Sequence, residues 1–203
     1  MGNCDYKLAK DILDDCGARS EKGVVKTGYI MNYDDVVKSS CERTGNILGA
    51  LALVTGAKGY KIVVPDGTPF NGTKIEAAVG TYSTKWNKDV AFVILNSGPD
   101  VTGDIIDKLA NGKFVIVLEN IFAGTDSKNK FEVYGFEQGL KMTAGARDLY
   151  SDDTDGGWSV TLQEAGAPTS GIFLFNESEA ATRTLLSTLG TAAEPEVEGQ
   201  TGT

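Results

Sequence analysis

The sequence predicts a mainly β fold of the α+β class: a β-sandwich or barrel with two or three short helices packed at its rim. About ten short segments are rich in β-branched and aromatic residues and are separated by Gly, Pro, Asn and Asp turn signals, a pattern typical of strands. Helical periodicity is confined to two or three segments, and no repeat of fixed period is present. A chain of 203 residues can bury one good core, so we expect a single β-rich domain over residues 1–190.

The chain is expected to begin with an arm of about residues 1–23. Within this arm, residues 5–16 carry a rough apolar stripe that stops at Gly17, which permits a short helix. Residues 24–33 are β-branched and aromatic and predict the first strand. Residues 34–45 predict a loop or one helical turn.

The next segments predict a hairpin. Residues 47–55 form an apolar strand, residues 56–59 a glycine-containing turn, and residues 60–64 the antiparallel partner. Two further strands are expected at residues 74–82 and 89–96.

Residues 100–110 form the clearest internal helix. Its buried stripe comes from Ile105, Ile106 and Leu109, and Asn111-Gly112 supplies a left-handed stop. Residues 113–122 then return as a strand. This stretch also permits a strand–helix–strand crossover with parallel pairing, whereas the rest of the chain predicts antiparallel pairing.

The last third predicts a β-meander closed by a helix. A polar hairpin loop at residues 123–130 precedes four strands, expected at residues 131–134, 140–146, 158–163 and 172–175. The closing helix spans residues 176–189, with Asn176 and Glu179 in a capping-box pattern. Residues 191–203 are acidic and poor in large apolar side chains, so we expect a disordered tail.

Composition excludes several classes of function. The chain has no histidine, which removes Ser-His-Asp and Cys-His relays and the usual zinc ligand sets. The three cysteines, Cys4, Cys16 and Cys41, are expected to be reduced thiols. The apolar runs are too short to span a membrane, and no secretory signal is expected.

The net charge of −9 argues against a grip on a phosphate backbone, which requires Lys and Arg. A negative surface would instead repel nucleic acid. The simpler alternative is that the charge only favours solubility.

Two motifs suggest a ligand site and are set aside. Residues 51–59 resemble the opening of a short-chain dehydrogenase, but Tyr60 and Ile62 stand where glycines are needed and a strand follows where a helix should begin. Residues 151–156 resemble a calcium loop, but its closing position is Leu162, so a solvated turn is expected.

Neither acidic pairs nor aromatic residues point to a site. The pairs Asp14-Asp15 and Asp34-Asp35 are expected to be solvated, and Trp86 and Trp158 to pack in or near the core. We therefore predict no catalytic, cofactor-binding or metal-binding residue, and a protein that is not an enzyme.

A resemblance supplies a function. Residues Phe114–Asn120, Phe131–Leu140 and Gly157–Leu162, together with the closing helix, resemble the tail tube (major tail) proteins of phages that infect Bacteroidetes-type bacteria. The similarity covers roughly residues 110–190, and a weaker similarity is present at Val24–Asp35.

The resemblance implies a β-sandwich or barrel subunit that forms six-membered rings, which stack into a hollow tube for genome passage. Implied partners are further copies of the chain, other tail or capsid proteins, and DNA that passes without specific binding, with no membrane involved. The implied location is the virion, assembled in the host cytoplasm.

An acidic chain then predicts a lumen that repels phosphates. Candidate ring-to-ring contacts are residues 65–72, residues 123–130, the N-terminal segment and the tail. Alternatives are a capsid-decoration protein, the tube of a bacterial injection machine, and a carboxylate-based enzyme or small-molecule binder.

Overall fold

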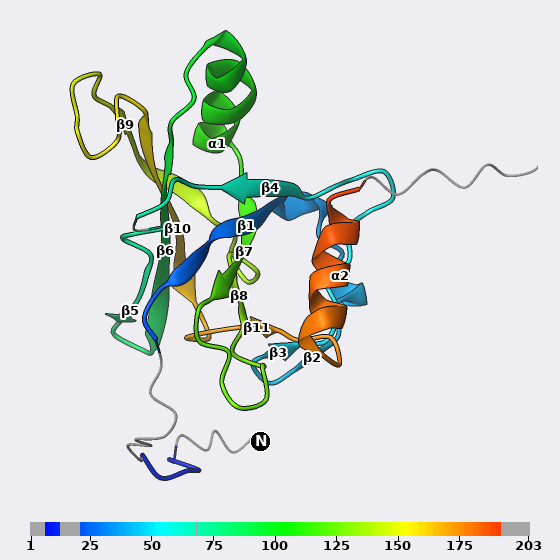
Figure 1. Cartoon of the computed structure of the whole chain (residues 1–203). Coiled ribbons are helices and arrows are strands. Elements are labelled where there is room, and N and C mark those ends of the chain that lie inside the picture. The colour runs from blue at the N-terminus through cyan, green and yellow to red at the C-terminus, as the bar shows by residue number, and fades with distance from the viewer. Residues whose placement is uncertain (1–6, 13–20, 68, 192–203) are drawn as a thin grey trace, which may run out of the picture.

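The protein folds as two β-sheets and one covering helix in three layers (Figure 1). The computed structural model describes residues 7–12, 21–67 and 69–191. The larger sheet has seven strands in the order β2-β3-β11-β8-β7-β1-β4. Its strands are β1 Val24–Asn32, β2 Arg43–Thr44, β3 Ile47–Leu48, β4 Tyr60–Val63, β7 Phe114–Asn120, β8 Phe131–Tyr134 and β11 Phe173–Leu174.

The smaller sheet has four antiparallel strands in the order β5-β6-β10-β9. Its members are β5 Lys74–Val79, β6 Thr84–Ile94, β9 Lys141–Arg147 and β10 Trp158–Ala167. The longest, β6, has 11 residues and pairs with β10 along most of its length.

Helical structure is short except at the C-terminal end of the fold. Two 3-10 turns, η1 Tyr33–Asp35 and η2 Lys38–Ser40, follow β1. A π-helical segment, η3 Val101–Ile106, continues directly into α1 Asp107–Asn111, and α2 Glu179–Leu189 covers one face of the larger sheet.

Strand β7 lies in the middle layer, between α2 and the smaller sheet. Its side chains point alternately into two separate cores, one on each face of the larger sheet. Val115 and Val117 belong to the core beneath α2, where Leu186 packs. Ile116 and Leu118 belong to the core between the sheets. All four β7 side chains are buried, as expected for a strand that is covered on both faces.

The N-cap of helix α2 lies two residues after Asn176, the cap that the sequence predicts, and the helix itself begins at Glu179. Ser178 is its N-cap, and the Ser178 hydroxyl accepts a hydrogen bond of 3.1 Å from the Ala181 N–H. The buried Thr182 hydroxyl accepts from the Asn176 N–H at 2.9 Å and holds the preceding turn. Glu179 is therefore the first helical residue and lies 3.0 Å from Arg183 one turn later.

The predicted hairpin of residues 47–55 and 60–64 is wrong. Of residues 47–55, only Ile47–Leu48 is a strand. The strand expected at residues 60–64 is present as β4, but it pairs with β1. The apolar character of the segment comes from Leu51 and Leu53, which pack into the core under α2 without sheet pairing beyond one bridge from Leu53 to Val36. Burial in a loop produced the same hydrophobic run as a strand would.

The parallel crossover between residues 89 and 118 is also absent, because β6 and β7 belong to different sheets. The helix between them is confirmed, although its first half is π-helical. Ile106 and Leu109 are buried as expected, but Ile105, expected in the same buried stripe, is 43% exposed. The parallel pair in the described chain is β3 with β11, which the sequence did not indicate.

Two predictions fall largely outside the described residues. Of the proposed helix at residues 5–16, only residues 7–12 are described, and they form no helix. Of the tail at residues 191–203, only Thr191 is described. Within the described part of the chain, no helix is long and apolar enough to cross a membrane.

Candidate functional site

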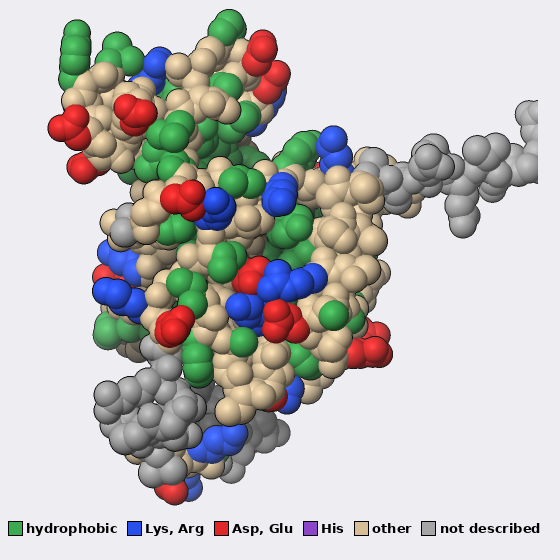
Figure 2. Space-filling view, viewed as in Figure 1, with side chains coloured by type: hydrophobic (Ala, Val, Ile, Leu, Met, Phe, Trp, Pro, Cys, Tyr) green, Lys and Arg blue, Asp and Glu red, His purple; other side chains and the backbone are tan. Residues whose placement is uncertain are grey.

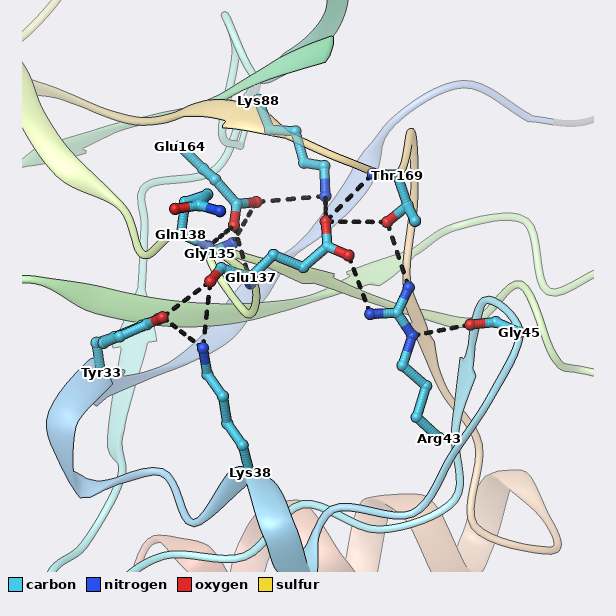
Figure 3. A network of polar contacts seen from close by, with 10 residues as sticks. All are labelled: Tyr33, Lys38, Arg43, Gly45, Lys88, Gly135, Glu137, Gln138, Glu164 and Thr169. Atoms are coloured by element: carbon cyan, nitrogen blue, oxygen red, sulfur yellow. Dashed lines mark hydrogen bonds and ion pairs between the residues drawn. The ribbon is translucent and has the colours of Figure 1, made fainter. Parts of the chain in front are cut away.

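The most organised group of polar side chains surrounds a buried ion pair in the smaller sheet (Figure 3). Its centre is Lys88 on β6 and Glu164 on β10, which are direct partners in the register of these strands. Lys88 Nζ lies 3.3 Å from Glu164 Oε2, and the two side chains are 1% and 0% exposed. Burial at this level requires each charge to be compensated within the protein.

Glu164 is compensated mainly by backbone N–H groups of the tight turn between β8 and β9. Its Oε2 accepts from the Gly135 N–H at 3.1 Å, and its Oε1 accepts from Glu137 at 3.0 Å and Gln138 at 2.6 Å. The turn forms because Gly135 adopts φ 82°, which places these N–H groups on one side. The carboxylate is thus held by three donors and one ammonium.

Glu137 joins the same group from the turn itself. Its carboxylate lies 3.8 Å from Lys88 Nζ, pairs with Arg43 Nη1 at 3.0 Å, and accepts from the Thr169 hydroxyl at 3.0 Å. Its backbone carbonyl accepts hydrogen bonds from Tyr33 and Lys38, as Figure 3 shows. Segments from five parts of the chain therefore meet at one point.

The carboxylates of this cluster are engaged within the protein. Both carboxylates are occupied by protein donors, and the cations that face them are Lys88 and Arg43. Catalysis by a carboxylate needs a position where a substrate proton can approach within hydrogen-bond distance. The contacts around Glu164 and Glu137 fill those positions with main-chain and side-chain donors.

A half-buried acid, Glu132, lies on β8. The Tyr134 hydroxyl donates a 2.9 Å hydrogen bond to Glu132 Oε2. Removal from water raises the pKa of Glu132, an effect only partly offset by the hydrogen bond from Tyr134. Burial, followed by the nearby Glu132 charge, raises the pKa of Tyr134 as well.

A groove of 320 Å³ lies between α2 and the strands β1, β4 and β7. Glu119 and Arg183 form a bidentate pair across it, with N–O distances of 2.6 and 2.8 Å, and Lys130 approaches Glu119 at 3.3 Å. Glu119 and then Glu179 hold the pKa of Arg183 above its usual range. Glu119 and Arg183 are therefore engaged with each other, whereas Lys61, which also lines the groove, pairs with neither of them.

The smaller sheet presents a different surface. Side chains alternate along its strands, and Val90, Phe92, Val160 and Leu162 face the core between the sheets. The residues between them, with their register partners, form what we call the outer face: Lys74, Glu76, Ala78, Lys85, Asn87, Asp89, Ala91, Val93, Lys141, Ala144, Ala146, Ser159, Thr161 and Gln163. Most of these side chains are small or uncharged.

A row of polar contacts crosses this outer face. Lys74, Asp89, Gln163 and Lys141 are successive register partners on β5, β6, β10 and β9. Gln163 donates to Asp89 at 2.7 Å, and Lys74 lies 3.8 Å from the same carboxylate. The strands at the two ends of the row, β5 and β9, are both edges of the sheet.

The residues considered from sequence are not brought together. Asp34 is exposed, Asp35 accepts a hydrogen bond from Asn32, and the pair at residues 14 and 15 lies outside the described chain. Cys41 is buried, and burial raises the pKa of its thiol, whereas Cys4 and Cys16 are not described. The described residues contain no group of three or more Cys, Asp or Glu placed to hold a metal ion.

The Lys88–Glu164 cluster was missed from the sequence. Its members are separated by 76 positions, and neither belongs to a motif. The available signal was a lysine at an inward position of an otherwise apolar strand, where Val90 and Phe92 follow at the same alternation. Comparison of the chain with protein-family models, with curated proteins and with solved structures finds no match.

Proposed function

We propose that this chain is a structural virion protein: a phage tail tube subunit that self-assembles into stacked rings through which the genome passes. The observation that carries the proposal is the four-stranded sheet, which has two free edges and an outer face of mostly small side chains. The resemblance of residues 110–190 to tail tube proteins points the same way.

The free edges explain how copies could join. Among the described residues, no strand pairs with the outer edge of β5 or of β9, and such edges pair readily with another chain. Pairing of β5 in one copy with β9 in the next is a heterologous contact, which repeats around a rotation axis until it closes. The product is a barrel to which each subunit contributes four strands.

In this arrangement the outer face lines the lumen, because the opposite face is filled by the core. Ala78, Ala91, Ala144 and Ala146 give a smooth wall. The anionic wall expected from the net charge does not describe this face, which carries three lysines and two acidic residues. We propose that DNA slides because charges are few and partly paired, as Lys74 is with Glu76 at 2.8 Å.

The alternatives have less support. A capsid-decoration protein or an injection-machine tube is also compatible with a self-associating sandwich. Hollow stacked rings would favour a tube over a decoration protein. An enzyme that uses carboxylates needs an accessible acid in a cleft, whereas Glu164 and Glu137 are saturated by protein donors.

Negative-stain electron microscopy of the concentrated full chain, with light scattering during gel filtration, tests the proposal. Hollow stacked rings are expected. A single copy at every concentration, or compact trimers, would contradict a tube.

Cysteine cross-linking tests the edge contact. We expect Ala78→Cys combined with Ala144→Cys, in a background with Cys4→Ser and Cys16→Ser, to yield a ladder of oligomers with a short thiol cross-linker that stops at the ring size. The matched control pairs Ala78→Cys with Val63→Cys on β4, an edge of the other sheet, and should give no such ladder.

A further inference from the structure

The two ends of the smaller sheet expose apolar side chains of the same kind and charges of opposite sign. One end, which we call the head, comprises residues 95–112 and 147–157, and it projects from the body in Figures 1 and 2. At the other end, the region that we call the base comprises residues 79–85 of the smaller sheet, together with residues 7–12 and with residues 121–130, which connect β7 and β8 of the larger sheet. Strand β6 separates the two, because Ile94 pairs with Trp158 at the head and Thr84 pairs with Val79 at the base.

The head is acidic and partly apolar. It contains seven aspartates, all exposed, against Lys108 and Arg147. Among these charges stand Tyr150 at 95% exposure, Leu149 at 65%, Leu95 at 45% and Ile105 at 43%. Figure 2 shows red and green side chains mixed over this projection. Exposed apolar groups within a predominantly negative surface are typical of a surface that a partner covers.

The base has the complementary character. Its segments contain five lysines and two aspartates. Tyr82 is fully exposed, Ile12 is 88%, Val79 85%, Leu8 84% and Ile121 41% exposed. The opposite signs of the two ends favour contact between a head and a base over contact between two heads.

We infer that the head of one copy seats on the base of another copy in the same orientation, and that this contact stacks the rings. The inference rests on the proposed function and names the surfaces that it needs. Edge pairing of β5 with β9 runs across the strands, so a ring closed by these edges turns its strand ends toward the neighbouring rings. The head and the base are those strand ends, about 35 Å apart along the 11 residues of β6.

The contact is heterologous, which gives it a direction. When two copies join, one uses its head and the other its base, so the pair still has one free head and one free base and stacking continues without limit. Ionic strength should weaken the attraction between the ends, because the charges are exposed.

Paired variants test the inference. The head variant carries Leu149→Asp and Tyr150→Asp, and the base variant carries Val79→Asp and Tyr82→Asp. Because these side chains are exposed, both variants should fold, which circular dichroism melting checks. The matched control carries Tyr60→Asp and Val63→Asp on β4, which lies at neither end.

Electron microscopy should show long tubes for the wild type and the control, and single rings for each end variant alone. Mixing the preformed rings of the two variants should yield stacks of two rings. The intact base of the head variant binds the intact head of the base variant, and the stack does not grow because its two outer ends carry the substitutions. Stacks of two from either variant alone would mean contact between like ends and would overturn the inference.

The two proposals fail separately. Long tubes from both end variants would overturn the head-to-base contact and leave the ring function standing. A wild type that forms neither rings nor tubes would overturn the function and, with it, the stacking contact.

Discussion

Lys88 and Glu164 stand opposite each other on neighbouring strands, with Nζ 3.3 Å from Oε2, and their side chains are almost completely buried. A buried ion pair is a weak source of stability in itself, because both charges lose their hydration. Here Glu164 also satisfies three N–H groups of the β8–β9 turn, so the pair fixes the turn to the smaller sheet. Its role is to set one arrangement of the two sheets.

Replacement of one partner should be costly. Lys88→Met leaves Glu164 without its ammonium, and we expect the free energy of unfolding to fall by about 3–5 kcal/mol. Urea denaturation measures this value. The combined variant with Glu164→Gln should recover part of the loss, because no unpaired charge then remains buried. The control Lys74→Met, at an exposed pair, should leave the urea midpoint nearly unchanged.

Glu132 makes stability depend on pH with a defined sign. Burial raises its folded pKa above the ordinary value of 4.5, so the folded state binds its proton more tightly than the unfolded state does. The stabilisation that protonated Glu132 adds to the folded state is complete below the unfolded pKa, and it is lost as the pH rises through the folded pKa. Glu132→Gln should therefore be more stable than the wild type at neutral pH and similar at low pH.

Urea titrations between acidic and neutral pH, compared for the wild type and Glu132→Gln, check this. Equal pH dependence of the two proteins would contradict the assignment to Glu132. The Tyr134 hydroxyl retains an acceptor in the variant, because the Gln side chain carries a carbonyl oxygen.

Gly135 tests the turn at the centre of the cluster. A Cβ at this position would overlap the Phe114 carbonyl oxygen and approach Leu140 N at 2.9 Å, in addition to the strain of φ 82°. Gly45 has a similar φ of 62°, but a Cβ there meets nothing within 4 Å. Gly45→Ala should cost about 1–2 kcal/mol from backbone strain alone, and Gly135→Ala clearly more.

Thermal melts of the two alanine variants provide the comparison. If both lowered the melting temperature equally, the packing around Gly135 would contribute nothing. The contrast isolates steric overlap from backbone conformation because the backbone requirement is shared.

Ser178 offers a test of the helix start. Ser178→Ala removes the acceptor for the Ala181 N–H and should cost about 1 kcal/mol. The control is Ser187→Ala near the end of α2, where the exposed hydroxyl bonds only the Thr184 carbonyl within the helix, and little change is expected. Asn176→Ala, the cap predicted from sequence, should cost less than Ser178→Ala.

Local patterns in the sequence predicted most helices and strands but not which strands pair with each other. Strand β7 was predicted because five consecutive apolar residues leave few alternatives, and α2 because Leu185, Leu186 and Leu189 share one face. The pairing of β4 with β1 was not foreseeable, because turn signals favour a local hairpin and long-range pairing leaves no mark on composition. Residues 47–55 misled for the same reason, since a buried loop and a strand have the same hydrophobicity.

The candidate surfaces were predictable to a lesser extent. Alternation in β6 and β10 fixes which side chains share a face, but which face meets the core depends on the other sheet. The difference in charge between head and base becomes visible only when residues 95–112 and 147–157 are known to lie together at one end of β6. Two segments separated by 34 residues gave no sign of this in the sequence.

The double burial of β7 has a consequence for how the molecule comes apart. Val115 and Val117 form a wall of one core while Ile116 and Leu118 form a wall of the other, so neither core can melt and leave its neighbour intact. Calorimetry should record one cooperative transition whose van't Hoff and calorimetric enthalpies agree. A fragment limited to the smaller sheet should fail to fold alone, because its apolar face would open directly onto water.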